Sequence, residues 1–212
     1  TNREQKQGLE FGKAEYDEID RYCKSLDLIW YASCWDEASV DFIDQYDPPC
    51  YKMASATLTD HDLLKYHRTK GKPIIIATGM STMNEIENAV KVLGKENLIL
   101  LHSTSTYPCK PEELNLKVIK TLIDKFDVPV GYSGHEVGIS TTVVAVAIGA
   151  FMVERHFTLD RSMYGSDQAA SLEQNGLRHI VDYIRTYEKA IGDGVKNVFD
   201  SELPVKERLR RK

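Results

Sequence analysis

The strongest constraint on the fold is a repeated alternation between short apolar segments and segments with helical spacing. Continuous apolar runs, such as PIIIA at 73–77 and LILLH at 98–102, are typical of strands that are buried on both faces. Helical segments lie between these runs, and successive strands are spaced about 20 to 30 residues apart. This alternation favours an α/β fold with a parallel sheet in which each crossover is a helix.

Local signals place the elements along the chain. Asp60 is a candidate N-cap, Gly71 a candidate C-cap, and Ser81 with Glu85 near it marks another helix start. The expected strands are 28–32, 50–55, 73–79, 98–102, 128–132 and 151–156, and the expected helices are 13–25, 37–46, 61–70, 82–93, 114–125, 141–149 and 177–191. No GxGxxG or P-loop motif follows any strand, which argues against a nucleotide-binding doubly wound sheet.

Most of the expected strands end in a cluster of polar residues. A (β/α)8 TIM barrel builds its active site from the carboxyl ends of its strands, and a closed barrel needs eight of them. The sequence contains about six. We therefore expect residues 1–194 to form a partial TIM barrel that lacks about the first two strands.

Composition limits the classes of partner. Hydrophobic residues make up 42% and charged residues 28% of the chain, as in an ordinary soluble protein, and the net charge of −5 favours neither nucleic acid nor a membrane surface. No signal peptide or membrane-length apolar run is found, so a cytoplasmic location is expected. The cysteines are scattered without CxxC spacing and are expected to be reduced thiols: Cys23, Cys34, Cys50 and Cys109.

Residues 128–171 carry the clearest chemical pattern. His135 follows one apolar strand, and Glu154 and His156 lie two residues apart on the next, so the latter two share one face while Arg155 takes the other. If the strands are parallel neighbours, His135 and His156 converge at their carboxyl ends. Two imidazoles beside a carboxylate suit a divalent metal with open coordination positions. The alternative is that both are structural histidines at strand ends. His67 and His102 are also expected to be structural.

Several phrases together point to a family. They are Lys52-Met-Ala-Ser55, Leu101-His-Ser-Thr-Ser105-Thr-Tyr107-Pro, Val130-Gly-Tyr-Ser133-Gly-His135-Glu, Glu154-Arg-His156-Phe-Thr-Leu-Asp160 and Gly165-Ser-Asp167-Gln-Ala-Ala-Ser171-Leu172. In this order and spacing they resemble the sialic acid synthase family, over nearly the whole chain from about residue 9 to about residue 202. The resemblance implies condensation of phosphoenolpyruvate with an N-acyl amino sugar, typically N-acetylmannosamine, to give a nonulosonic acid and phosphate. It also implies a TIM barrel followed by a small antifreeze-like domain, in a homodimer, and residues 195–212 resemble the linker toward that C-terminal domain, which is expected to be missing here.

The resemblance implies roles for individual residues. His135 and His156 match ligands of a divalent cation, Mn2+ or Mg2+, and Glu154 matches an acid that positions or deprotonates the attacking water. The residues that match contacts to phosphoenolpyruvate are Lys52, Ser33, Ser55, Ser105 and Ser133. Tyr107 and Asp167 match contacts to the sugar. The small-molecule substrates are thus expected to be phosphoenolpyruvate and an N-acyl amino sugar.

Three positions depart from the usual family pattern and leave the sugar open. Ser105 stands where some members have Asn, Thr57 where many have an acid, and Gln168 where the usual phrase has His. Legionaminic and pseudaminic acid synthases share the motifs and are alternatives. A 3-deoxy-heptulosonate type of synthase is disfavoured because its cysteine ligand and extra arginines are missing from these phrases. A catalytically silent, truncated barrel that only binds ligand is the remaining alternative.

Overall fold

The computed structural model describes residues 8–211, and strands and helices alternate along it as the sequence predicts. The strands are β1 (Tyr51–Met53), β2 (Ile74–Ala77), β3 (Leu98–Ser103), β4 (Val130–Gly134) and β5 (Val153–Arg155). The α-helices are α2 (Lys13–Ser25), α3 (Glu37–Asp44), α4 (His61–Thr69), α5 (Met83–Leu93), α6 (Val118–Phe126), α7 (Ser140–Ala147), α8 (Gln174–Ala190) and α9 (Leu203–Leu209). Short 3-10 turns are η1 (Ser55–Thr57), η2 (Pro111–Glu113), η3 (Gln168–Ala170) and η4 (Asp200–Glu202).

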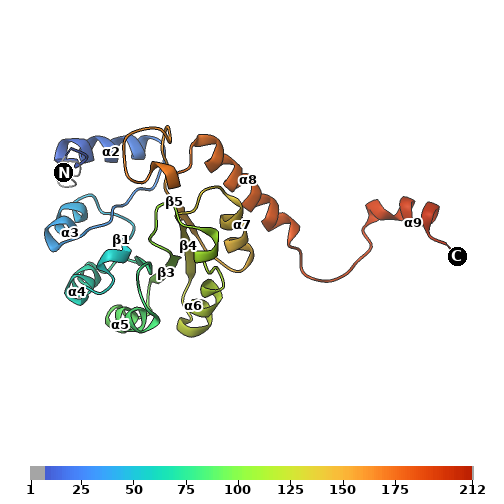
Figure 1. Ribbon diagram of the computed structural model, residues 1–212, viewed down its shortest axis with the longest axis horizontal. Coiled ribbons are helices and arrows are strands. Elements are labelled where there is room, and N and C mark those ends of the chain that lie inside the picture. The colour runs from blue at the N-terminus through green and yellow to red at the C-terminus, as the bar shows by residue number, and fades with distance from the viewer. Residues whose placement is uncertain (1–7, 212) are drawn as a thin grey trace.

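The sheet is wound in one direction. Its order is β1-β2-β3-β4-β5, which is also the order along the chain, and each neighbouring pair is parallel. Helices α3 to α6 fan around the outside of the strands (Figure 1). A doubly wound sheet would reverse its strand order at a switch point, whereas a barrel does not. The described strands therefore form an arc of a (β/α) barrel, as the α/β prediction requires.

Strand alternation divides the core into two parts. Ile74 and Ile76 point toward the helices and join the large core, whereas Ile75 and Ala77 point to the inner face, where Leu101 packs with them. Ile74 and Ile76 are fully buried, and burial of such a side chain contributes about 1.5–3 kcal/mol. The larger cluster lies beneath the helices, so the inner face near the carboxyl ends is free for polar side chains.

The segment 28–32 is not a regular strand, which corrects the prediction from its apolar run. A single parallel bridge, from Ser33 to Lys52 of β1, joins this segment to the sheet. Leu28 and Ile29 remain exposed, at 58% and 73%. Strand pairing needs a partner on at least one side over several residues, and the short β1 offers little length for it. The apolar composition of 28–32 was therefore not sufficient evidence for a regular strand.

The start of α5 also differs from prediction by one residue. The N-cap is Thr82, not Ser81, and its hydroxyl accepts a hydrogen bond from the backbone N–H of Glu85 while the Glu85 carboxylate accepts one from the backbone N–H of Thr82. Ser81 instead donates its hydroxyl to the carbonyl oxygen of Gly79. Thr82 lies three residues before Glu85, which is the spacing of a capping box, whereas Ser81 lies four residues before it, so the spacing in the sequence favours Thr82.

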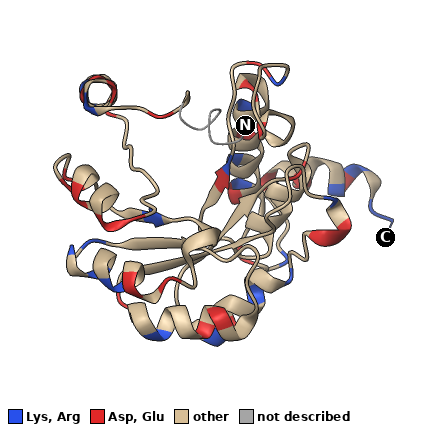
Figure 2. Cartoon of the chain, turned by 60° about the vertical axis from the view of Figure 1, so that its left-hand side comes forward, with Lys and Arg blue, Asp and Glu red and all other residues tan. Residues whose placement is uncertain are grey.

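The carboxyl end of the chain leaves the barrel arc. After the 17-residue helix α8, an extended segment leads to η4 and α9, which project away from the rest (Figure 1). Charged residues lie mainly on the helices and loops, and the sheet is mostly free of them (Figure 2). None of the helices within residues 8–211 is long and apolar enough to cross a membrane.

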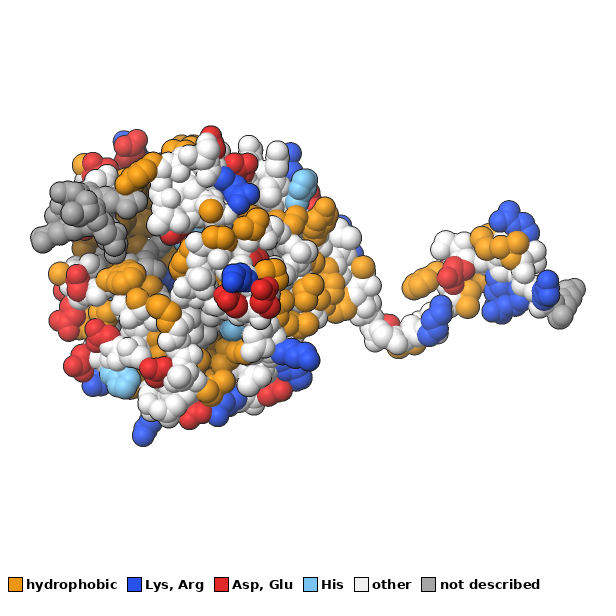
Figure 3. Space-filling view, viewed as in Figure 1, with side chains coloured by type: hydrophobic (Ala, Val, Ile, Leu, Met, Phe, Trp, Pro, Cys, Tyr) orange, Lys and Arg blue, Asp and Glu red, His pale blue; other side chains and the backbone are white. Residues whose placement is uncertain are grey.

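One side of the arc carries exposed apolar side chains beside α7 and α8 (Figure 3). Phe151 is 68% exposed, and Leu177 and Val181 of α8 are also exposed. These residues line a groove that also reaches β5 at Val153. The apolar groove therefore follows the edge of the sheet at β5.

Replacing Thr82 with Ala tests the assignment of the cap. Loss of the hydroxyl acceptor leaves the N–H of Glu85 without this partner, and we expect the free energy of unfolding to fall by about 1 kcal/mol. Urea unfolding followed by circular dichroism measures this change. The neighbouring Ser81→Ala variant is the matched control and should lose clearly less; an equal or larger loss at Ser81 would contradict the assignment.

The buried His67 predicts acid sensitivity. Burial lowers its pKa below the ordinary value, a hydrogen bond between Nδ1 and Leu63 O acts in the opposite sense, and Nε2 finds no hydrogen-bond partner among the described residues. Below about pH 6.5 the unfolded chain then binds more protons than the folded one, so stability falls as pH decreases. We expect the unfolding free energy to decrease from about pH 8 to about pH 5, and His67→Leu to make this slope shallower.

The exposed His179 of α8 provides the control for that measurement. His179→Leu should leave the pH slope as in the unaltered protein. Burial also lowers the pKa of His102, so the His67→Leu variant should keep part of the slope. An unchanged slope in His67→Leu would show that His67 does not titrate on unfolding in this range.

Candidate functional site

A cavity of ≈ 490 Å³ opens at the carboxyl ends of the strands. Every strand contributes to it directly or through the loop that follows, as expected for the active-site face of a barrel. The lining residues are Ser33, Trp35, Lys52, Ala54, Ser55, Ala56, Ala77, Met80, Ser103, Ser105, Tyr107, Ser133, His135, Glu154, Arg155 and His156. All the site residues predicted from the sequence are in this set except Asp167.

Strand register places one polar row across the inner face. Ser103 of β3 pairs with Ser133 of β4, and Ser133 pairs with Glu154 of β5. Residues paired in this way lie side by side on the same face of a sheet. Because Tyr132 belongs to the helix-facing core, its neighbour Ser133 must face inward. Packing of the apolar core thus aims the polar row into the cavity.

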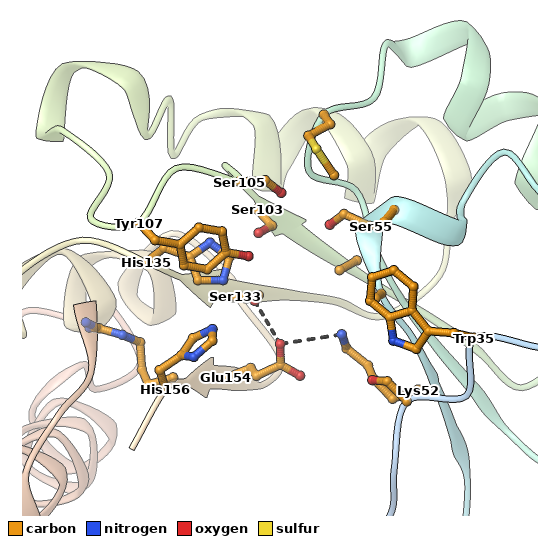
Figure 4. Close-up of a pocket in the computed structure, with 16 residues that line it drawn as sticks. Trp35, Lys52, Ser55, Ser103, Ser105, Tyr107, Ser133, His135, Glu154 and His156 are labelled. Atoms are coloured by element: carbon orange, nitrogen blue, oxygen red, sulfur yellow. Dashed lines mark hydrogen bonds and ion pairs between the residues drawn. The ribbon is translucent and has the colours of Figure 1, made fainter. Parts of the chain in front are cut away.

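Glu154 lies at the centre of a polar chain of contacts. Ser133 donates its hydroxyl to Glu154 Oε1 at 2.8 Å, and Lys52 Nζ lies 3.5 Å from the same oxygen (Figure 4). The Lys52 side chain is only 9% exposed, whereas that of Glu154 is 34% exposed. A nearly buried ammonium needs a negative partner, and the carboxylate fills that place. An anionic ligand entering the cavity can compete with Glu154 for Lys52.

The two predicted histidines converge. Their ring centroids are 5.2 Å apart, although His135 follows β4 and His156 follows β5. The ring of Tyr107 covers both, with centroids 4.2 Å from His135 and 5.5 Å from His156 (Figure 4). Burial lowers the pKa of His135, and the nearby His156 acts in the same direction. The His135 imidazole is therefore neutral at neutral pH, which is the form that binds a metal.

The donor set fits a divalent metal in part. His135 Nδ1 lies 2.7 Å from the carbonyl oxygen of Thr104, a contact that makes Nδ1 the protonated nitrogen and leaves Nε2 with its lone pair. Within residues 8–211, no group of three His, Cys, Asp or Glu side chains is arranged to hold a metal. The pair of imidazoles could thus supply two ligands, and the other positions would be left to water or substrate. Open positions of this kind are what catalysis by a metal requires.

Asp167 takes a place different from the other predicted residues. It does not line the cavity, and its Oδ2 lies 3.7 Å from His156 Nδ1. Carboxylates in this position commonly orient a metal-binding histidine from behind. Asp167 is therefore connected to the site by its proximity to His156 and not by lining the cavity. Contact between Asp167 and a sugar stays a prediction.

Among the lining residues that were not predicted from the sequence, three have larger or polar side chains that face the cavity: Ser103, Trp35 and Met80. Ser103 is 6% exposed, and its hydroxyl has no hydrogen-bond partner within the described residues. The sequence could have predicted that Ser103 faces the cavity, because Leu101 and Ser103 are two residues apart on β3 and therefore share its inner face. Trp35 and Met80 come from loops that follow their sheet segments, and no periodicity predicts where a loop side chain lies. Figure 4 shows Trp35 across the cavity from the histidines.

Two predicted serines depend on a glycine. Ser55 Oγ accepts a hydrogen bond from the backbone N–H of Gly79 at 2.9 Å. A Cβ atom at Gly79 would lie 2.2 Å from Ser105 Oγ and 2.8 Å from Ser55 Oγ. These distances are too short for real contacts, so only glycine allows both hydroxyls to approach this turn. Gly79 therefore permits a hydroxyl cluster that can donate hydrogen bonds to an anion.

Gly79→Ala tests the role of this cluster. The added methyl must displace the hydroxyls of Ser55 and Ser105, and we expect binding of inorganic phosphate to weaken about 10- to 100-fold, since a hydrogen bond to a charged group contributes about 1.5–3 kcal/mol. Isothermal titration calorimetry measures the affinity. Gly176→Ala, in helix α8, is the matched control and should bind phosphate as the unaltered protein does. Equal affinity in both variants would contradict the proposed hydroxyl cluster.

Comparison with known proteins agrees with the geometry. An uncharacterized protein of Methanocaldococcus jannaschii is 41% identical over 96% of the chain, and the human N-acetylneuraminate-9-phosphate synthase is 39% identical over 99%. The N,N'-diacetyllegionaminic acid synthase of Legionella pneumophila is 34% identical over 100%. The chain spans 61%, 59% and 61% of the length of these relatives.

A solved structure shares the fold. The N-acetylneuraminic acid synthetase of Leptospira borgpetersenii, in complex with citrate, superposes with a TM-score of 0.85 at 32% identity, covering 96% of this chain and 73% of that one. The NeuB family model matches residues 1–196. The chain belongs to the NeuB family, whose characterised relatives include sialic acid and legionaminic acid synthases.

Proposed function

We propose that this chain forms the phosphoenolpyruvate- and metal-binding part of a nonulosonic acid synthase. The reaction joins phosphoenolpyruvate to an N-acyl amino sugar, with N-acetylmannosamine as the leading candidate, and releases phosphate. The observation that carries the proposal is the convergence of His135, His156, Glu154 and Lys52 in one cavity of a NeuB family chain. The names of the human and Leptospira relatives favour a sialic acid product.

The anionic substrate would bind at the Lys52 side of the cavity. Lys52 and the hydroxyls of Ser33, Ser55, Ser105 and Ser133 supply a cation and hydrogen-bond donors for its phosphate and carboxylate. On binding, the anion would replace Glu154 as the ionic partner of Lys52. Of the contacts described above, the Glu154 carboxylate would then keep the hydrogen bond from Ser133. Substrate binding would thus free Glu154 for the chemical step.

The imidazoles of His135 and His156 would hold Mn2+ or Mg2+, and the bound ion would supply a Lewis acid for the sugar aldehyde. The enol carbon attacks the aldehyde carbon, and the carbonyl oxygen becomes a hydroxyl after protonation. Glu154 would accept a proton from water as the water oxygen bonds to C2 of the former enol. The tetrahedral centre then collapses with cleavage of the C–O bond to phosphate, giving a 2-keto acid. Lys52 offsets the charge on the departing phosphate.

The described cavity contains fewer positive charges than would balance phosphoenolpyruvate, which is a trianion. Its cationic lining residues within 8–211 are Lys52 and Arg155, and Arg155 is paired with the buried Glu136. We propose that further family elements complete the site, namely barrel strands that would pair beyond β5 and 28–32, an antifreeze-like domain after the linker 195–212, and a second subunit. The apolar groove along β5, α7 and α8 supports additional packing there.

A legionaminic or pseudaminic acid synthase is the second candidate. The Legionella relative matches the whole chain, and Tyr107 and Asp167, which lie near the histidines, are the residues that would meet the sugar. These products differ in the sugar half, so the phosphoenolpyruvate side of the site would be the same. Parallel assays with several N-acyl amino sugars separate the candidates.

Phosphate release from phosphoenolpyruvate tests the proposal. We expect turnover that needs Mn2+ or Mg2+ and an N-acyl amino sugar, on this chain or on a longer gene product that contains it. Glu154→Gln should lower kcat about 10²- to 10⁴-fold, the range for a lost general base. His135→Ala and His156→Ala should abolish metal-dependent turnover.

His179→Ala is the matched control, because it removes an exposed imidazole of α8 that does not line the cavity. This variant should keep full activity. Release of phosphate that is independent of both histidines would contradict the assigned site. No release with any N-acyl amino sugar, together with measurable phosphoenolpyruvate binding, would replace the synthase proposal with a catalytically silent ligand-binding barrel.

A further inference from the structure

A buried ion pair lies directly behind the two histidines. Arg155 Nη1 is 3.1 Å from Glu136 Oε1, and the two side chains are only 3% and 2% exposed. Burial lowers the pKa of Arg155, and the carboxylate of Glu136 opposes that shift. Replacing a buried ion pair by apolar groups often leaves stability unchanged or raises it, so the pair needs an explanation beyond stability.

Arg155 connects two segments through the backbone. Its Nη2 donates to the carbonyl oxygen of Glu136 at 2.6 Å, and its Nη1 donates to the carbonyl oxygen of Gly138 at 2.9 Å and to the hydroxyl of Thr142 at 2.7 Å. The guanidinium therefore holds the loop that follows β4 against β5.

The carboxylate of Glu136 is held from its other sides. It accepts hydrogen bonds from Tyr132 OH at 2.8 Å, from Thr141 at 2.6 Å and from Thr142 at 3.1 Å. A Cβ atom at Gly134 would lie 2.6 Å from Glu136 Oε2 and 3.1 Å from Arg155 Cδ, so the glycine lets the pair pack against the strand. Each partner is thus fixed by several independent contacts.

Chain connectivity links the pair to the site. His135 immediately precedes Glu136, and His156 immediately follows Arg155. Side chains alternate along a strand, so Glu154 and His156 share the inner face, while Arg155, which also borders the cavity, sends its guanidinium to the loop after β4. A fixed Glu136–Arg155 distance therefore limits how far the two imidazoles can separate or rotate.

We propose that Glu136 and Arg155 are positioning residues that set the spacing of His135 and His156 for metal binding. This inference rests on the proposed metal-dependent function, and it concerns the backbone on either side of the two histidines rather than a contact of the pair with a ligand. Its role is to hold the backbone from which both imidazoles extend. The contacts that matter are those from Arg155 to the carbonyls of Glu136 and Gly138, not the charge of the pair alone.

The test separates metal affinity from stability. Mn2+ affinity is measured by electron paramagnetic resonance titration, and thermal unfolding is measured on the same samples. Arg155→Met should raise the Kd for Mn2+ about 10- to 100-fold, the range seen for residues that support metal ligands. Arg155→Lys keeps the charge but cannot reach both carbonyls, so it should also raise the Kd at least severalfold.

The double variant Glu136→Gln/Arg155→Met is the decisive one. It removes both charges, so no unpaired buried charge remains and the unfolding temperature should recover toward that of the unaltered protein. The carbonyl contacts are still missing, so the Kd should stay raised about 10- to 100-fold. Recovery of the Kd together with the unfolding temperature would overturn the positioning role.

Tyr51→Phe is the matched control. It removes the buried hydrogen bond from Tyr51 OH to Asp44 in the helix-facing core, and it should lower the unfolding temperature without changing the Kd. Unchanged Mn2+ affinity in all Arg155 variants would overturn the inference alone. Absence of Mn2+ binding by the unaltered protein, or binding that survives both His135→Ala and His156→Ala, would overturn the metal site of the proposed function as well.

Discussion

Burial of one face of a parallel sheet against its helices is the constraint on which the site depends. Tyr51, Met53 and Tyr132 are almost completely buried in the helix-facing core. Since side chains alternate along a strand, this burial forces Lys52 and Ser133 to the opposite face. A slip of one residue would exchange the faces and bury the polar residues, so the core determines the strand register as well as stability.

The same alternation gives the two faces of β5 different tasks. Its inner face carries Glu154, and His156 follows at the end of the strand, while Arg155 on the outer face reaches the loop after β4. Chemistry and positioning thus come from adjacent residues of one short strand. This arrangement explains why a strand of three residues, intermediate in burial, can hold a site: its ends are tied to β4 by the sheet and by the Arg155 contacts.

Electrostatics in the cavity are balanced without a ligand. Lys52 lies near Glu154, and Arg155 pairs with Glu136, so no described lining cation lacks a carboxylate neighbour. His135 is neutral because it is buried. An anion that reaches Lys52 must compete with the carboxylate of Glu154, and a metal could bind the free imidazole nitrogen of His135 without first removing a proton. The cavity is therefore prepared for ligands of both signs at different ends.

The order of strands and helices, the pairing of His135 with His156 and the shared face of Glu154 and His156 could be predicted from the sequence, because hydrophobic period and motif spacing are local properties. The sequence could not show that 28–32 lacks strand partners, and Ser103, Trp35 and the Glu136–Arg155 pair were not predicted from it. Those outcomes depend on which segments become neighbours. Local composition determined the elements and the chemistry they carry; tertiary packing alone decided distances, burial and partners, because these come from contacts between residues far apart in the chain.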